Sequence, residues 1–363
     1  MGAIEQFHTA PGTLDLGWGH PHPDALPLDA WADATADALR RHGASALDYG
    51  RAVGPEPLID WIGGRSDEVF VTAGASHALE LIASVFGRGG PALVDTPTYH
   101  YALRTLADHG LRLIAAPAHD PAAMLELIRR HRPTLLYLVP TFGNPTGTSL
   151  PGPQRIALIE AARRGGVTIV EDDTYRDLSY DGVPAPPSLY SLDASDVVIR
   201  ISSLAKTVAP GLRLGWITAS PDRITALTRR GYVDSGGGVN HTTALAMASF
   251  ATSGGYSTHL DSLRARYAGQ RDALAAALRL HLPTASFDVP EGGWFLWVRL
   301  PGADELTKPA TAHGVAFLPG DTFFLDRKPD RPIRLSFSRY GPEDLAEAAR
   351  RLASAHRAMP RGR

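Results

Sequence analysis

The stretch SSLAKTVAPGLRLGW (residues 202–216) contains a lysine in a chain that otherwise uses arginine for positive charge. Of the 36 basic residues only three are lysines, and the other two are Lys308 and Lys328. A lysine amine can lose its proton and act as a nucleophile, whereas a guanidinium stays protonated. The stretch joins two apolar runs, 196–203 and 214–220, that are typical of strands. We therefore expect Lys206 to follow a strand end and to have a chemical role that arginine cannot fill.

The composition indicates a globular protein that acts on small molecules. Hydrophobic residues make up 44% of the chain and charged residues 20%, with a net charge of −2. No basic face is expected, so nucleic acid and membrane surfaces are excluded as partners. The absence of cysteine excludes disulfides, thiolate catalysis and cysteine-bound metals. Because we find neither a secretory signal nor an apolar run of membrane-spanning length, we expect a cytoplasmic protein.

Short apolar runs alternate with amphipathic helical patterns through the first two thirds of the chain. The runs are 69–74, 92–97, 111–117, 134–141, 167–173, 196–203 and 214–220. Repeated strand–helix–strand order predicts an α/β fold, with strands buried on both faces. We expect a three-layer αβα domain around a mostly parallel seven-stranded sheet.

The pattern changes after about residue 240, where a smaller α+β domain is predicted. A helical pattern with a glycine pair at 254–255 is followed by shorter apolar runs and a terminal helix from Pro342. We expect residues 46–250 to form the large domain and residues 251–363 the small one. Residues 1–45 should pack with the small domain. The three glycines at 236–238 fit either a flexible loop or a simple turn.

Polar residues follow several of the predicted strands, where ligands bind in open α/β sheets. They belong to seven motifs: YGRAVGPEPL (49–58), VTAGASHAL (71–79), DTPTY (95–99), NPTG (144–147), DDTY (172–175), SLAKTVAPGLRLG (203–215) and IRLSFS (333–338). In order and spacing these motifs resemble those of the fold type I, pyridoxal-phosphate-dependent aminotransferases of class I/II. The resemblance covers most of the chain. It implies that the large domain binds pyridoxal 5'-phosphate and that an amino group passes between an α-amino acid and a 2-oxo acid.

The resemblance implies three catalytic residues, Lys206, Asp172 and Tyr175. Lys206 resembles the lysine that forms an imine with the cofactor aldehyde and then moves the substrate proton as base and acid. Asp172 resembles the carboxylate that keeps the pyridine nitrogen protonated, so that the ring can act as an electron sink. Asp173 competes for this role, but side chains alternate along a strand, and the spacing to Tyr175 selects Asp172.

Further cofactor contacts follow from the same resemblance. Tyr175 and Asn144 would bind the phenolic oxygen of the ring, and Tyr99 would stack on the ring face.

The phosphate would be held at the start of a helix by Ala75 and Ser76, with Ser203 and Arg213 as further ligands. Tyr49 resembles a tyrosine that reaches the phosphate of the neighbouring subunit, which implies a homodimer with shared active sites.

The substrate would meet Arg334, which resembles the arginine that clamps the α-carboxylate. Asn144 and Gly19 would complete this binding site, since GWGHP (17–21) resembles the opposite wall. No metal site is expected, because HPHP (20–23) is more typical of a loop. Trp18, Tyr232 and Phe324 are candidates for the side-chain pocket.

Three other functions remain as alternatives. The same cofactor and nearly the same residues also support elimination, cyclisation or oxidation of an amino acid in a specialised biosynthetic pathway. A ligand sensor fused to a winged helix is disfavoured, because the motifs begin by residue 49. Ser203 and Lys206 also fit the S-x-x-K motif of serine acyl-enzymes, but the S-D-N and K-T-G tripeptides of that class are absent.

Overall fold

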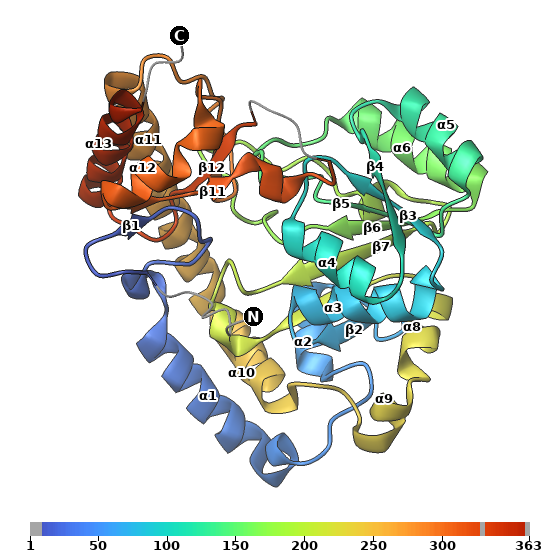
Figure 1. Ribbon diagram of the computed structural model, residues 1–363. Coiled ribbons are helices and arrows are strands. Elements are labelled where there is room, and N and C mark those ends of the chain that lie inside the picture. The colour runs from blue at the N-terminus through green and yellow to red at the C-terminus, as the bar shows by residue number, and fades with distance from the viewer. Residues whose placement is uncertain (1–8, 327–330, 360–363) are drawn as a thin grey trace.

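A seven-stranded sheet occupies the centre of the large domain (Figure 1). The structure is a computed structural model that describes residues 9–326 and 331–359, so Lys328 lies outside the described residues. The strand order is β2-β8-β7-β6-β5-β3-β4, and β8 runs antiparallel to both of its neighbours. The strands are β2 (Val69–Thr72), β3 (Pro91–Asp95), β4 (Arg112–Ala116), β5 (Leu135–Leu138), β6 (Thr168–Asp172), β7 (Val198–Ser203) and β8 (Gly215–Thr218). Each predicted run overlaps one of these strands, although β3 begins one residue before its run, and the prediction of a mostly parallel sheet is confirmed.

Helices cover both faces of this sheet and make three layers (Figure 1). They are α2 (Glu56–Ile62), α3 (Ala75–Ile82), α4 (His100–Asp108), α5 (Pro121–His131), α6 (Gly152–Gly165), α7 (Leu189–Leu192), α8 (Pro221–Thr228) and α9 (Gly231–Gly236). The alternation of side chains along β5 explains the arrangement. Leu135 and Tyr137 join the core that includes α3 and α4, whereas Leu136 and Leu138 join the core under α5 and α6. Burial on both faces accounts for the continuous apolar runs in the sequence.

The remainder of the chain forms a smaller α+β unit beside the sheet (Figure 1). Its elements are α10 (His241–Thr252), α11 (Gly255–His281), β9 (Phe295–Val298), α12 (Thr307–Ala312), β10 (Val315–Ala316), β11 (Leu318–Pro319), β12 (Ile333–Ser336) and α13 (Pro342–Ala358). β11, β12 and β9 form an antiparallel sheet, and α11 packs along α13. Gly254 adopts a left-handed φ of 83° and splits the long helical pattern into α10 and α11. Short 3₁₀ helices occur at Pro23–Ala25, Gly43–Leu47, Pro210–Leu212, Ala303–Glu305 and Gly320–Phe323, and a π-helical turn at Ala83–Gly87. No helix of the described residues is long and apolar enough to cross a membrane.

The N-terminal segment contacts both parts of the molecule. β1 (Leu14–Asp15) pairs with β10, and the backbone N–H of Ser336 in β12 donates to the Leu16 carbonyl oxygen at 2.7 Å. α1 (Leu28–His42) lies along α10, which in turn packs against α2 of the large domain (Figure 1). The domain boundaries that we expect from the sequence stay a prediction.

The glycines at 237 and 238 form a close backbone contact rather than an open loop. A Cβ atom at position 237 would lie 2.1 Å from the carbonyl oxygen of Gly50, and one at 238 would lie 2.4 Å from that of Arg51. The N–H of Gly238 donates to this second oxygen at 3.1 Å. Only glycine permits such an approach, so this stretch ties the chain around residue 50 to the end of α9.

The antiparallel strand β8 brings three chain segments to one edge of the sheet. Gly215, its first residue, pairs with Ser203 at the end of β7 and with Thr72 at the end of β2. The contact is close, because a Cβ atom at Gly215 would lie 2.6 Å from the carbonyl oxygen of Ser202 and 3.1 Å from the Cα of Gly74. Residues just before β8 therefore meet residues just after β7 and β2.

Replacing Gly215 by alanine tests this packing. The backbone atoms that face position 215 cannot move independently, so Gly215→Ala should lower the free energy of unfolding by about 1–3 kcal/mol. The control is Gly152→Ala, because nothing lies within 4 Å of a Cβ atom at that position. Urea unfolding of both variants measures the effect, and equal midpoints would contradict the close contact.

Candidate active site

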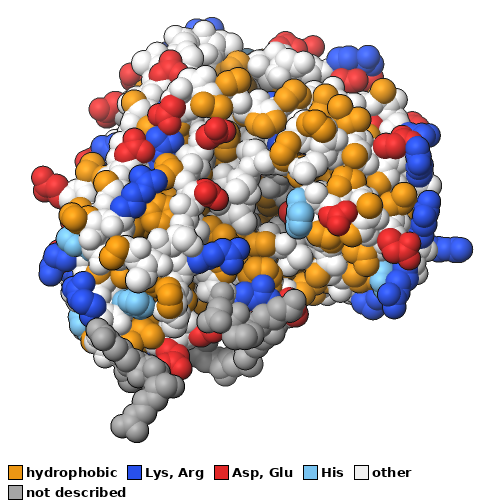
Figure 2. Space-filling view, turned by 90° about the horizontal axis from the view of Figure 1, so that it is seen from above, with side chains coloured by type: hydrophobic (Ala, Val, Ile, Leu, Met, Phe, Trp, Pro, Cys, Tyr) orange, Lys and Arg blue, Asp and Glu red, His pale blue; other side chains and the backbone are white. Residues whose placement is uncertain are grey.

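A cavity of about 260 Å³ lies at the carboxyl edge of the sheet, against β9 and β12 of the smaller unit. Figure 2 shows the molecule hollowed near its centre, with acidic and basic side chains interspersed over the surrounding face. Every residue predicted for catalysis or for binding the cofactor and the α-carboxylate lines this cavity except Tyr49. Ligands of open α/β sheets bind at this edge.

Three consecutive carboxylates end the middle strand of the sheet, and all three are buried. Glu171 lies 3.8 Å from the guanidinium of Arg155, and its carboxylate accepts two backbone N–H groups of α7. Asp173 lies 2.9 Å from Arg200. Asp172 lines the cavity. The alternation of the strand thus separates the two acids that have arginine partners from the one that does not.

Asp172 is bound only by uncharged groups among the described residues. It accepts hydrogen bonds from the hydroxyls of Tyr137 at 2.8 Å and Thr174 at 2.5 Å, and no described lysine or arginine forms an ion pair with it. Burial is the largest influence on the carboxyl and raises its pKa. A cation beside the carboxylate would reverse this shift. A protonated pyridine nitrogen is such a cation, so the residue fits the cofactor that the sequence indicates.

An anion-binding corner is formed where α3 begins. Gly74, with a φ of 87°, precedes the helix, and no side chain caps its first N–H groups. Ala75, Ser76 and Ser203 line the cavity at this corner. Helix N-termini with free N–H groups attract phosphates.

Arg213 closes the same corner. Its Nη2 donates to the carbonyl oxygen of Ala73 at 3.1 Å, and no described carboxylate forms an ion pair with it. A Cβ atom at Gly74 would lie 3.0 Å from this nitrogen, so glycine lets the guanidinium approach the helix start. A phosphate group matches this donor set.

Lys206 lies in the cavity with few polar contacts. Its Nζ donates to the carbonyl oxygen of Gly19 at 3.4 Å and lies 4.5 Å from the centroid of the Trp294 ring. Burial is the main cause that lowers the pKa of the amine to about 8, and Arg334 lowers it further. A substantial fraction of the amine is therefore neutral, and so nucleophilic, near neutral pH.

Arg334 is a buried cation without a carboxylate partner among the described residues. It donates to the side-chain oxygen of Asn144 at 2.6 Å and to the carbonyl oxygen of Gly17 at 2.5 Å. Its Nε is buried and makes no hydrogen bond. Burial lowers the pKa of the guanidinium to about 10, so it stays charged at neutral pH. Burying a charge is costly unless it is paired, so this group suits a carboxylate ligand.

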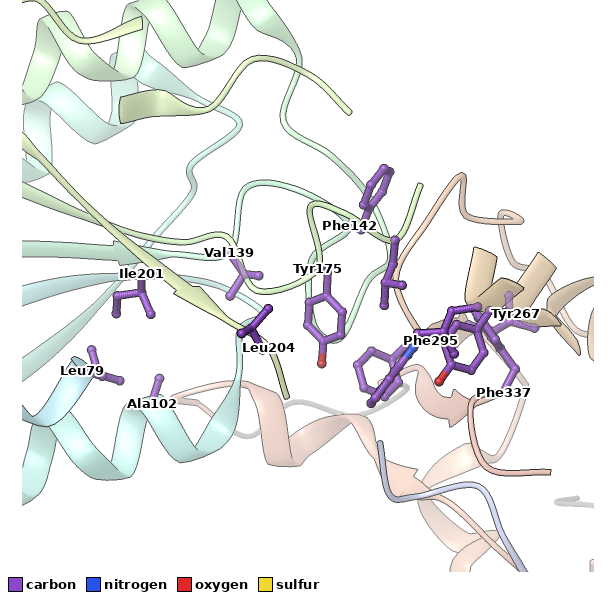
Figure 3. Close-up of a cluster of buried hydrophobic side chains, with 14 of the residues drawn as sticks. Leu79, Ala102, Val139, Phe142, Tyr175, Ile201, Leu204, Tyr267, Phe295 and Phe337 are labelled. Carbon is purple, nitrogen blue, oxygen red and sulfur yellow. The ribbon is translucent and has the colours of Figure 1, made fainter. Parts of the chain in front are cut away.

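Two tyrosines form the apolar sides of the cavity. Figure 3 shows Tyr175 between Val139 and Leu204 at the strand ends and Phe295 of β9. Its ring meets that of Phe295 edge-on at 5.9 Å, and burial raises the pKa of its hydroxyl. Burial also raises the pKa of Tyr99 to about 12. Both hydroxyls are therefore protonated hydrogen-bond donors at neutral pH.

The remaining candidates lie partly outside the cavity. Tyr49 is 81% exposed and does not line the cavity of its own chain. Of the three candidates for the side-chain pocket, Trp18 lines the cavity and Tyr232 and Phe324 do not. Tyr137 was missed because its sequence position shows only a buried strand residue.

Arg155 was also missed, although it holds the loop that carries Asn144. It lies on α6, is fully buried, and donates to the carbonyl oxygens of Pro140 at 2.6 Å and Leu150 at 2.7 Å. These two residues lie on either side of Asn144 in the chain. In the sequence Arg155 is one of many helical arginines, and nothing marks it as buried.

The chain belongs to the aminotransferase class I and II family, whose model matches residues 12–352. Members of this family that resemble the chain over nearly its whole length include the 2-aminoadipate transaminase of Thermus thermophilus, which is 34% identical over 95% of this chain and 90% of that protein. Aromatic-amino-acid aminotransferase 1 of Thermococcus litoralis is 32% identical over 94% of this chain and 87% of that protein. The protein is thus a pyridoxal-phosphate-dependent aminotransferase that acts on amino acids and 2-oxo acids.

Solved structures agree with this assignment. The α-aminoadipate aminotransferase of Thermus thermophilus, complexed with N-(5'-phosphopyridoxyl)-L-leucine, has a TM-score of 0.87 and 33% identity, with 96% of this chain and 92% of that chain covered. The kynurenine aminotransferase of Pyrococcus horikoshii has a TM-score of 0.88 and 27% identity, with 97% and 92% covered. These relatives favour amino-group transfer over elimination, cyclisation or oxidation.

Removing the buried guanidinium tests the role of Arg155. Arg155→Met would leave three carbonyl oxygens and the carboxylate of Glu171 without their donor, so stability should fall by about 3–5 kcal/mol. The control is Arg163→Met on the same helix, because Arg163 is exposed and pairs only with Glu160. Thermal and urea unfolding should leave the control close to the wild-type protein. An Arg155→Met protein as stable as the control would contradict this assignment.

Proposed function

We propose that Lys206 binds the cofactor aldehyde and carries the proton while an amino group is exchanged between an α-amino acid and a 2-oxo acid. The observation that carries the proposal is a set of unmatched charges around one amine. Among the described residues, Asp172 lacks a cation, and Arg213 and Arg334 each lack an anion. A ligand with a basic ring nitrogen and a phosphate, together with a substrate carboxylate, would satisfy all three groups.

The cofactor would be held by groups that are already in place. Pyridoxal phosphate, when bound, supplies an aldehyde carbon and a ring that accepts electron density. The carboxylate of Asp172 would bind the ring nitrogen and hold a proton on it. Ser76, Ser203 and Arg213 would bind the phosphate at the start of α3, with the backbone N–H of Ala75. Tyr99 would cover the ring face.

The substrate would be oriented by Arg334 and Asn144. A guanidinium binds a carboxylate through two nitrogens, and the unpartnered Nε of Arg334 is available for one of them. Asn144, fixed by its bond to this arginine, and Tyr175 would bind the cofactor ring oxygen as well. The carbonyl oxygen of Gly19 lies next to the Lys206 amine and forms part of the opposite wall.

Proton transfer would then depend on the Nζ atom of Lys206. With a pKa lowered to about 8, the freed amine can take the α-proton of the substrate and return it to a neighbouring carbon. The apolar walls around it, including Trp294, exclude the water that would stabilise its charged form. The same burial therefore makes the amine both a nucleophile and a base.

We also propose a homodimer in which Tyr49 completes the site of the partner subunit. Its exposure, and that of the nearby Leu47, supports a contact with another surface, since large apolar side chains that lie together on a surface often mark interfaces. A cytoplasmic location is part of the proposal, because amino acids and 2-oxo acids of general metabolism are found there.

Replacing the amine tests the central assignment. Lys206→Arg keeps the charge but loses the nucleophile, so borohydride reduction followed by peptide mass spectrometry should find no cofactor attached at residue 206. The matched control is Lys308→Arg on α12, which should keep the attachment and full turnover. In the wild-type apo-protein the rate of cofactor uptake should rise with pH up to about 8 and then level off, because only the neutral amine reacts. Attachment elsewhere would refute the assignment.

A mixing experiment tests the contribution of Tyr49 across the dimer. Tyr49→Phe should weaken cofactor binding by about 10- to 100-fold, as expected for a lost hydrogen bond to a charged group. Mixed dimers with Lys206→Ala subunits should regain tight binding and turnover in one site, because that site combines an intact Lys206 with the partner's intact Tyr49. Tyr232→Phe, another exposed tyrosine, is the control. Tight binding by Tyr49→Phe alone would contradict the shared site.

A further inference from the structure

We propose that the substrate side-chain compartment of this cavity is built for aromatic or large apolar amino acids and disfavours acidic ones. The inference rests on the proposed roles of Lys206, Arg213 and Arg334. It concerns lining residues of the cavity to which these roles assign no cofactor or carboxylate contact. They include Trp18, His100, Tyr101 and Thr105.

The charges of the cavity leave no cation for a second carboxylate. Among the described residues that line it, the lysine and arginine side chains are Lys206, Arg213 and Arg334. The amine serves the chemistry, Arg213 lies at the start of α3, and Arg334 takes the α-carboxylate. A basic side chain is also disfavoured, because Asp172 is the acidic residue of the described lining and faces the cofactor.

Two histidines line the cavity, but both are neutral at physiological pH. Burial is the main cause that lowers the pKa of His100 to about 4, and Arg334 lowers it further. Burial likewise lowers the pKa of His20 to about 4, with Lys206 and Arg339 as additional causes. At pH 7 such a group is protonated in roughly one molecule in a thousand. Neither histidine therefore carries a positive charge that could pair with a side-chain carboxylate of the substrate.

The remaining wall is aromatic. The ring of His100 lies 4.1 Å from that of Tyr101 and meets Phe323 edge-on at 5.2 Å. Phe295 lies on the opposite side and stacks on the guanidinium of Arg334 at 4.0 Å. Aromatic rings gain from edge-to-face contacts in such surroundings, whereas a carboxylate loses its hydration without compensation.

The position of Trp18 is fixed relative to the carboxylate clamp. The carbonyl oxygen of Gly17 accepts a hydrogen bond from Arg334, and that of Gly19 accepts one from Lys206. A Cβ atom at Gly19 would lie 2.9 Å from the ring of Phe295, so only glycine lets the segment approach so closely. The backbone on both sides of Trp18 is therefore held close to Arg334 and Lys206, and the residue lines the cavity there.

Calorimetry with unreactive ligands tests the inference without any turnover. 3-Phenylpropanoate and glutarate each carry one carboxylate for Arg334 and differ at the other end. The holoenzyme should bind 3-phenylpropanoate at least about tenfold more tightly, a ratio that corresponds to roughly 1.4 kcal/mol. Equal or tighter binding of glutarate would overturn the inference.

Adding a positive charge to the cavity lining tests where the side-chain compartment lies. Thr105→Arg should strengthen glutarate binding by about tenfold and weaken 3-phenylpropanoate, because it places a charge on the aromatic wall. The control is Thr258→Arg, which adds the same charge at an exposed site on α11 and should change neither affinity. Identical behaviour of the two variants would overturn the placement of the compartment.

The cofactor absorbance separates this inference from the proposed function. Phenylalanine should convert the cofactor to its amine form faster than 2-aminoadipate does. Faster conversion by 2-aminoadipate would overturn the aromatic preference and leave the aminotransferase role intact. No conversion by either amino acid would count against the proposed function, and the calorimetric comparison would still decide the inference.

Discussion

Residues 171–173 place three buried carboxylates in a row at the end of β6, the middle strand of the sheet. The surrounding residues supply the arginines and hydrogen-bond donors that these acids need. Buried charges are tolerated only when they are paired or hydrogen-bonded. Arg155 faces Glu171 and Arg200 faces Asp173 on one side of the strand. On the other side Asp172 accepts hydrogen bonds from uncharged groups, namely the hydroxyls of Tyr137 and Thr174 and the backbone N–H of Thr174. The position that we propose for the cofactor ring thus follows from the alternation of side chains along β6, which directs Asp172 to the opposite face from Glu171 and Asp173.

Arg155 links this charge pattern to the loop that carries Asn144. The same guanidinium that faces Glu171 also holds the carbonyl oxygens on either side of Asn144. Asn144 in turn bonds to Arg334 across the boundary between the sheet and the smaller unit. The ion pair of Glu171 is therefore connected through a few hydrogen bonds to Arg334, the proposed carboxylate clamp.

Much of the fold and of the site could be predicted from the sequence, because the signals are local. Continuous apolar runs gave the seven strands, and residues next to strand ends, such as Lys206 and Asp172, are brought together by any parallel sheet. Thr174 was within a recognised motif, but its bond to Asp172 needs coordinates. Arg155, Tyr137 and His100 could not be found, since their roles depend on burial and on partners far away in the chain. The glycines at 237 and 238 looked like a loop because sequence cannot show which backbone lies against them.

The segment around Trp18 is an accessory wall that the sheet does not supply. It reaches the cavity through two carbonyl oxygens and one glycine contact, while the strands beneath it carry the cofactor groups. Backbone contacts of this kind tolerate many side chains at the intervening position. Evolution can therefore exchange the residue at position 18 and retune substrate range while the catalytic apparatus stays untouched, which makes this short stretch a natural place for relatives to diverge.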